Sequence, residues 1–266
     1  MSVYEIRSIS QVGTSEPFEL QVSRGQIPAH YFVHKFGYNP TISTDTETVW
    51  AQGGLYVYPT IASTMYISSS STADTSAGTG ARTATVSGLD ANFDEISETV
   101  SLNGQTGVQL NGALNWYRVN RIIVNTAGSG GANAGVLYVG TEATPSGGVP
   151  TNKYATVAIG DNQTLMCFWT VPKGYSAYVH QKDVSASSSA GKFAIFSLLA
   201  RPDGGVFNVK DRVLLANNST AISYWNPIKF TEKTDIEIRA QADSAGGTIT
   251  ASATLDITYI KNEGGL

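Results

Sequence analysis

Apolar and polar residues alternate strictly near the C-terminal end of the chain, in the segment GTITASATLDITYI at 247–260. Successive side chains of a strand point to opposite faces, so a period of two predicts a strand with one face in a core and one in water. The predicted inward residues are Ile249, Ala251, Ala253, Leu255, Ile257 and Tyr259.

The preceding segment, TDIEIRA at 234–240, alternates in the same way. The pattern predicts a strand whose inward residues are Ile236, Ile238 and Ala240, with Glu237 and Arg239 outward. Ala245-Gly246-Gly247 separates the two segments and predicts a hairpin between them.

Short segments of this kind fill most of the chain, with turn signals about every 8–15 residues and hardly any helical period. ATVSG and EISETVSL flank a turn at 89–94, Asn103-Gly104 and Asn111-Gly112 predict hairpin turns, and Pro172-Lys173-Gly174 suits a type II turn. This pattern predicts an all-β fold, an antiparallel β-sandwich of jelly-roll type.

The first 45 residues differ, because three prolines punctuate them and dense alternation is missing. We predict an N-terminal arm at 1–45, packed on its own domain or on a neighbouring subunit, and a β-sandwich at 46–266. The best candidate for a subdivision of the sandwich is 144–152. Segments of small residues indicate flexible loops; they lie at 68–81, 127–135, 144–149 and 185–191.

The loop that contains Gly78-Thr79-Gly80 does not match a dinucleotide fingerprint, since Thr83 stands where the third glycine belongs and a strand follows instead of a helix. We interpret residues 71–90 as an exposed Ser/Thr/Gly loop for contact with another subunit, with Arg82 at its foot.

The amino-acid composition limits the classes of partner that the protein can bind. Lys and Arg total 17 against 21 Asp and Glu, so no basic field is available for nucleic acid. No apolar run approaches the length of a membrane span, and the N-terminus has no signal-peptide pattern. The single cysteine, Cys167, lies in the apolar run LMCFW and is predicted to be a core residue, as is Trp169.

Candidate chemistry is sparse. Asp90-Ala91-Asn92-Phe93-Asp94 begins like a calcium loop, but Glu95 replaces the required glycine and Ser101 the bidentate glutamate. His30 and His34 would face one metal together only on a helix, which their surroundings do not favour. We find no nucleophile elbow or cysteine–histidine pair, and predict no enzyme activity, cofactor or metal.

The predicted outward strand faces carry Ser, Thr, Asn and Gln in place of Lys and Glu. Such a surface suits a protein held in a rigid assembly, and it also suits sugar binding. The candidate residues for contact with a protein or a glycan are Tyr31, Phe32, Phe36, Trp50, Arg82 and Trp225.

Six stretches spread over most of the chain form one further pattern: GQIPAHYFVHKFGYNPTI, ETVWAQGGLYVYP, DTSAGTGARTATVSGLDANFDEISETVSLNG, TVPKGYSAYV, LLARPDGGVFNVK and EKTDIEIRA. Together they resemble virion structural proteins of tailed bacteriophages, notably marine ones. The resemblance implies a capsid decoration or cement protein, assembled in the bacterial host cytoplasm. It implies a homo-oligomer, with a trimer favoured, and the major capsid protein or other virion proteins as partners. A receptor- or glycan-binding module of a head or tail fibre is the alternative, and a carbohydrate-active enzyme is the third hypothesis.

Overall fold

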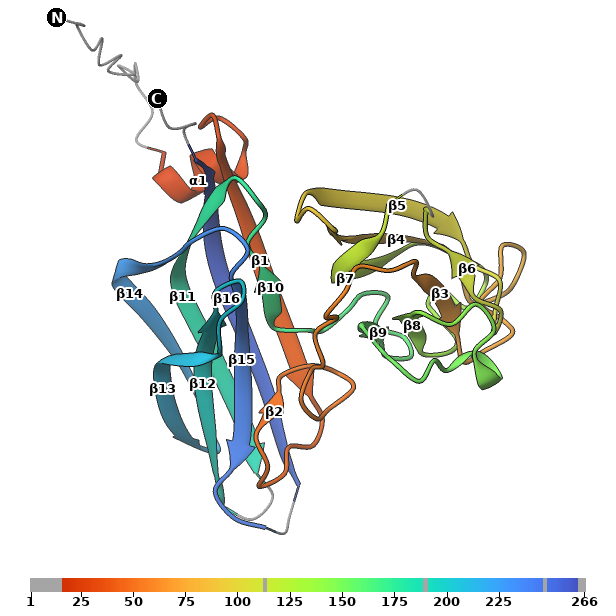
Figure 1. The fold of residues 1–266 in the computed structure, drawn as a ribbon. Helices are drawn as coiled ribbons and strands as arrows, with labels where there is room; N and C mark the ends of the chain where they lie inside the picture. The colour runs from red at the N-terminus through yellow and green to blue at the C-terminus, as the bar shows by residue number, and fades with distance from the viewer. Residues whose placement is uncertain (1–15, 112–113, 189–190, 246–247, 263–266) are drawn as a thin grey trace, which may run out of the picture.

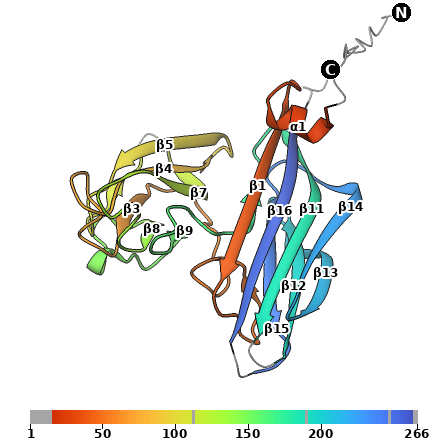
Figure 2. The same ribbon diagram turned by 180° about the vertical axis from the view of Figure 1, so that it is seen from behind.

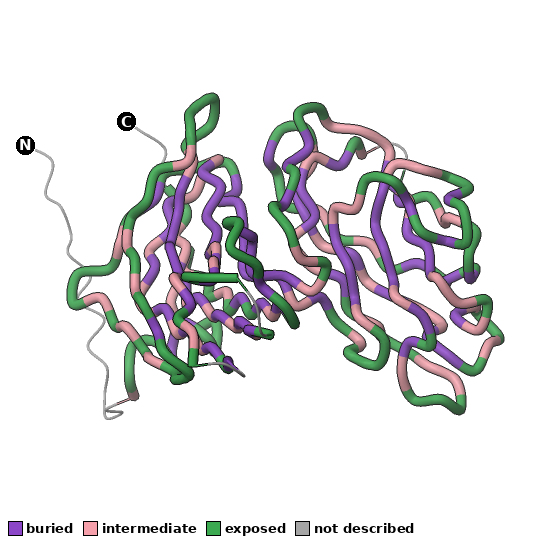
Figure 3. Tube along the Cα trace, turned by 90° about the horizontal axis from the view of Figure 1, so that it is seen from below, coloured by how far each residue is buried: buried purple, intermediate pink, exposed green. Residues whose placement is uncertain are grey.

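The computed structural model describes residues 16–111, 114–188, 191–245 and 248–262. These residues form two lobes (Figure 1), and each lobe encloses a hydrophobic core of its own. In Figure 3 the buried segments run through the interior of both lobes. The elements of the first lobe are α1 (Phe18–Ser23), β1 (His30–Asn39), β2 (Glu47–Thr48), β10 (Phe168–Thr170), β11 (Tyr175–Ser188), β12 (Phe193–Arg201), β13 (Asn208–Ala216), β14 (Ser219–Phe230), β15 (Asp235–Ala242) and β16 (Ile249–Lys261).

The first lobe is a jelly roll. One sheet has the order β1-β16-β11-β14, and the other has β10-β15-β12-β13, with β2 also paired to β15. Because β2 and β10 follow one another along β15, they occupy a single strand position. In chain order the strand positions are then 1-8-3-6 in one sheet and 2-7-4-5 in the other, which is the two-Greek-key order of a jelly roll. The all-β sandwich prediction is confirmed.

The alternation of β16 is also confirmed, since Ile249, Ala251, Ala253, Leu255 and Ile257 are buried in the core between the sheets. The predicted hairpin between β15 and β16 is wrong, because the two strands belong to different sheets. Their apolar faces meet across the core instead of lying side by side. The turn residues indicate a chain reversal but do not specify which strand is the hydrogen-bond partner; Gly246 and Gly247 lie outside the described residues.

The second lobe is inserted into the strand position shared by β2 and β10. The backbone N–H of Val49 donates to Ile238 O, and that of Ile238 donates to Cys167 O, so the strand resumes where it was interrupted. The inserted elements are β3 (Tyr66–Ser69), β4 (Ala81–Asp90), β5 (Glu95–Ser101), β6 (Val108–Gln109), β7 (Trp116–Ala127), β8 (Leu137–Gly140), the 3₁₀ turn η1 (Ser146–Gly148) and β9 (Ala155–Val157). Their sheets have the orders β6-β3-β8-β9 and β5-β4-β7.

This insertion divides the chain differently from the sequence prediction. The segment 144–152 lies between β8 and β9, inside the second lobe, and residues 30–39 of the predicted arm form an edge strand of the jelly roll. The predicted hairpin of β4 and β5 is present, with Leu89 opposite Glu95. Gly174 has φ +79°, as the predicted type II turn requires.

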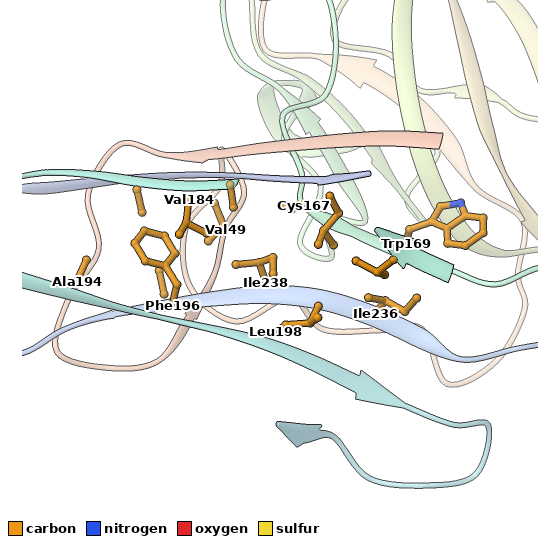
Figure 4. Close-up of a cluster of buried hydrophobic side chains, with 14 of the residues drawn as sticks. Val49, Cys167, Trp169, Val184, Ala194, Phe196, Leu198, Ile236 and Ile238 are labelled. Carbon is orange, nitrogen blue, oxygen red and sulfur yellow. The ribbon is translucent and has the colours of Figure 1, made fainter. Parts of the chain in front are cut away.

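Cys167 and Trp169 lie in the core of the jelly roll, as the apolar run predicted (Figure 4). Burial raises the pKa of the Cys167 thiol. Gly37 of β1 packs against the strand position shared by β2 and β10, since a Cβ at residue 37 would lie 2.2 Å from Val49 O and 2.5 Å from Cys167 N. A glycine at this position lets β1 approach the interrupted strand closely.

The outward position predicted for Glu237 is wrong. Its side chain is fully buried, because the chain that leads into the second lobe covers this face of β15. The hydroxyls of Thr48 and Tyr58 each donate to Glu237 Oε2 at 3.3 Å, and Arg239 pairs with Oε1. Burial raises the pKa of Glu237 despite these partners.

The small-residue loops at 68–81 and 127–135 are joined to one another by Asp74, which is fully buried. Its Oδ1 accepts hydrogen bonds from the backbone N–H groups of Ala81 at 2.7 Å and Ala134 at 2.8 Å. Its Oδ2 accepts from Ser69 Oγ at 2.6 Å and from the backbone N–H of Gly135 at 2.8 Å. The two segments are thus tied together as a unit, which corrects their interpretation as flexible loops.

Candidate contact surface on the jelly roll

The open edge of the jelly roll, formed by β13 in one sheet and β14 in the other, lies on the side away from the second lobe (Figures 1 and 2). Each is the last strand of its sheet, so both offer an unpaired backbone edge. Unpaired strand edges are templates for pairing with another chain. We call β13, β14 and Val206, which lies just before β13, the open edge.

A bulge in β14 determines which side chain this edge exposes to solvent. The strand pairs with β11 up to Ser223, opposite Gln181, and again from Ile228, opposite Val179. Between these two pairs β14 has more residues than β11, and residues 224–227 have no partner on β11. Trp225, one of these residues, is 97% exposed. Bulges re-aim side chains and disrupt the ladder locally. The bulge therefore projects a large aromatic side chain into solvent.

An ion pair inside the sandwich anchors the bulge. The hydroxyl of Tyr224, next to Trp225, donates to Asp211 Oδ2 at 2.8 Å, and Lys182 Nζ donates to the same oxygen at 2.6 Å. The Lys182 side chain is fully buried. Burial alone would raise the pKa of Asp211, but the hydrogen bonds from Lys182 and Tyr224 hold it below its ordinary value. Burial and the charge of Asp211 raise the pKa of Tyr224.

Replacement of Asp211 by asparagine will lower the free energy of unfolding by about 2–3 kcal/mol, because it leaves the buried Lys182 ammonium without a counter-charge. The urea midpoint at neutral pH measures this. Because the folded pKa of Asp211 is depressed, its contribution is present above the ordinary pKa of about 3.9 and is lost as the pH falls through the folded value. The variant and the wild type should therefore converge in acid. Equal midpoints at neutral pH, or a loss as small as that of the exposed control Asp203→Asn, would contradict the anchor role.

Exposed apolar side chains also occur on β13 and just before it. Val206, Val209 and Leu214 are all exposed. Val209 lies opposite Leu199 and Leu214 opposite Ile195, so both point to the outer face of their sheet. Exposed apolar side chains on an edge strand are available for contact with another chain.

The sequence identified Trp225 but not its supports. Lys182, Asp211 and Tyr224 carry no motif, and their meeting depends on a bulge. The one local signal is Pro227, since proline within a strand indicates an edge or a bulge.

The structure removes Trp50 from the candidates. It is 4% exposed, and its indole Nε1 donates to Gly53 O at 2.9 Å. Tyr56 and Phe168 pack edge-on against it, so it belongs to the core of the second lobe. The chain entering the insertion folds back over this ring, which the sequence pattern could not show.

The other candidates are not gathered at the open edge. Tyr31, Phe32 and Phe36 are exposed on β1, the opposite edge strand of the sheet that contains β14. Tyr31 stacks on Tyr259 with ring centroids 5.1 Å apart. Arg82 is half-buried in the second lobe, where its Nε donates to Gly78 O at 3.0 Å.

The motifs considered for metals have structural partners. Asp90 Oδ1 accepts from the backbone N–H groups of Asn92 at 2.8 Å and Asp94 at 3.0 Å, which is an Asx turn. His34 Nδ1 lies 2.6 Å from Asp256 Oδ1. Across the described ranges, no group of three His, Cys, Asp or Glu side chains could hold a metal, and none of the described helices is long and apolar enough to cross a membrane.

No family model matches the chain, and no curated protein matches it either. Among solved structures, the chain is similar to infectious bursal disease virus, Gx strain, with 12% identity over 89% of this chain and 77% of that one and a TM-score of 0.24. It is also similar to the VP2 subviral particle of infectious bursal disease virus, with 12% identity over 94% and 83% and a TM-score of 0.21. These similarities are weak, and the fold assignment above depends on the strand order alone.

Proposed function

We propose that this protein is a non-enzymatic structural component of a phage particle, which decorates and stabilises the capsid as a homo-oligomer. The exposed Trp225 on the bulge of β14 is the observation that carries the proposal. The resemblance of the sequence to virion proteins of tailed bacteriophages supports the location in the particle. A trimer is the favoured oligomer, and the major capsid protein is the favoured further partner.

The open edge supports self-association as the mode of assembly. β13 and β14 each offer a free strand edge there, and tryptophan is among the residues that contribute most to binding at interfaces. Lys182, Asp211 and Tyr224 hold the backbone beside Trp225, so little backbone freedom is lost when this segment binds a partner. Contacts shared between subunits and the shell then stabilise the particle by mass action.

Replacement of Trp225 by serine will weaken self-association by about 2 kcal/mol or more. Light scattering coupled to size exclusion measures the mass across a range of concentrations, and co-sedimentation measures binding to purified capsids. At concentrations where the wild type is monomeric, the unfolding midpoint should not change, because the indole is outside the core. The exposed Ile61→Ser in the second lobe is the matched control. A wild-type protein that stays monomeric and does not bind capsids would overturn the proposal.

A glycan-binding module is the second candidate, because an exposed indole also suits stacking against a sugar ring. The same variant separates the two functions. Loss of binding to a glycan array on Trp225→Ser, with the oligomer mass unchanged, would favour the glycan-binding module over the structural component.

A further inference from the structure

A cavity of about 330 Å³ lies at the junction of the two lobes. Val33 and Lys35 of β1 and Trp169 of β10 line it from the jelly roll, and β4, β5 and β7 line it from the second lobe. Ligand pockets are typically about 300–1,000 Å³ and are frequent at domain interfaces.

Two cations face this cavity. Lys35 is 2% exposed, and its Nζ donates to the backbone carbonyl of Asn120 at 2.6 Å. Arg121 Nη2 donates to the backbone carbonyl of His34 at 2.7 Å. Within the described part of the chain, neither side chain forms an ion pair. An ammonium has three donors and a guanidinium five, so donors remain for an anion.

Burial, together with the positive charge of Arg121, lowers the pKa of Lys35 to about 7. The Cys167 thiol also faces this ammonium, but burial raises its pKa and keeps it neutral. Among the described residues that line the cavity, the one carboxylate is that of Glu95, which accepts a hydrogen bond from the Tyr259 hydroxyl at 3.3 Å. Two cations with a single carboxylate nearby are short of negative charge, and a bound anion would supply it.

The remaining lining suits a small polar molecule with an apolar face. Ser87, Ser97 and Glu95 provide hydroxyl and carboxylate groups, while Val33, Ile96 and Trp169 provide apolar surface. We infer that the cavity binds a small hydroxylated carboxylate, about the size of an acidic monosaccharide, with its carboxylate on Lys35 and Arg121. This site is separate from the open edge and does not depend on assembly.

Calorimetric titration of the full chain with sodium glucuronate tests the inference, with glucose and inorganic phosphate as comparison probes. We expect glucuronate to bind, and glucose and phosphate to bind more weakly. Lys35→Met should weaken glucuronate binding about tenfold or more, through the loss of a charge-assisted hydrogen bond. The exposed Lys173→Met is the matched control.

A proton readout distinguishes a direct contact from a structural effect. A carboxylate favours the charged form of Lys35, so binding should take up a proton near neutral pH and weaken as the pH rises from about 6 to 8. Arg121→Gln is the second variant if Lys35→Met fails to fold. Absence of glucuronate binding, or equal binding by folded Lys35→Met, would overturn the site. If phosphate binds as tightly as glucuronate, the site does not recognise the hydroxyl groups, and the inference of a hydroxylated ligand is wrong.

Discussion

Replacement of Asp235 by alanine will lower the free energy of unfolding by about 3–5 kcal/mol, the loss expected when one partner of a buried ion pair is removed. Asp235 of β15 is buried and accepts from Arg118 Nε at 2.9 Å and Arg118 Nη2 at 3.2 Å. Arg201 Nη2 donates to it at 2.6 Å, and so does the hydroxyl of Thr170. Without the carboxylate, the Arg118 charge would stay buried and unpaired.

The location of this pair makes the effect larger than a local loss. Arg118 belongs to β7 of the second lobe and Asp235 to the jelly roll, so the pair joins the lobes. The guanidinium also lies over the Tyr117 ring, 4.1 Å from its centroid, and near the Tyr58 ring. Because aromatic rings surround Arg118, little water is available to solvate it after the substitution.

Chemical denaturation with both circular dichroism and tryptophan fluorescence measures the Asp235→Ala effect. We expect a lower midpoint and a transition that no longer coincides between the two probes, since the lobes lose a buried ion pair that joins them. Asp203→Ala, at an exposed aspartate of the jelly roll, is the control. An Asp235→Ala midpoint equal to that of this control would show that the pair does not stabilise the junction.

Replacement of Asp74 by alanine will lower the free energy of unfolding by about 3 kcal/mol or more. Three backbone N–H groups and one hydroxyl lose their acceptor together. Each buried donor left unsatisfied costs about 1–3 kcal/mol. The carboxylate also explains the glycine at position 80, where a Cβ would lie 2.1 Å from Asp74 Oδ1. No other residue fits there without displacing the carboxylate.

Hydrogen exchange and thermal unfolding measure the Asp74→Ala effect. The amide protons of Ala81, Ala134 and Gly135 should lose protection, while those of the jelly roll keep theirs. Asp74→Asn retains one carbonyl acceptor and should have an intermediate effect. Asp161→Ala, an exposed aspartate in the same lobe, should leave both measurements unchanged. Unchanged protection in Asp74→Ala would contradict the role of Asp74 as the link between the two loops.

The sequence by itself determined the strands and their buried faces. The alternation of β16 and the hairpin of β4 with β5 could be predicted because side-chain direction in a strand and tight turns are local properties. The core positions of Cys167 and Trp169 followed from an apolar run in the same way. The candidate Trp225 was identified by its residue type, but its exposure depends on a bulge that two neighbouring strands create.

Only the tertiary structure decided which strands pair and which outward positions are covered. β15 and β16 follow one another in sequence but belong to different sheets, because β15 pairs with β10 and β12 whereas β16 pairs with β1 and β11. Glu237 is buried because the chain that leads into the inserted lobe covers it, and Trp50 because the same chain folds back over it while Phe168 packs against it. The cavity around Lys35 likewise needs both lobes. These contacts join residues far apart in the chain, and a period of two in a single strand carries no information about them.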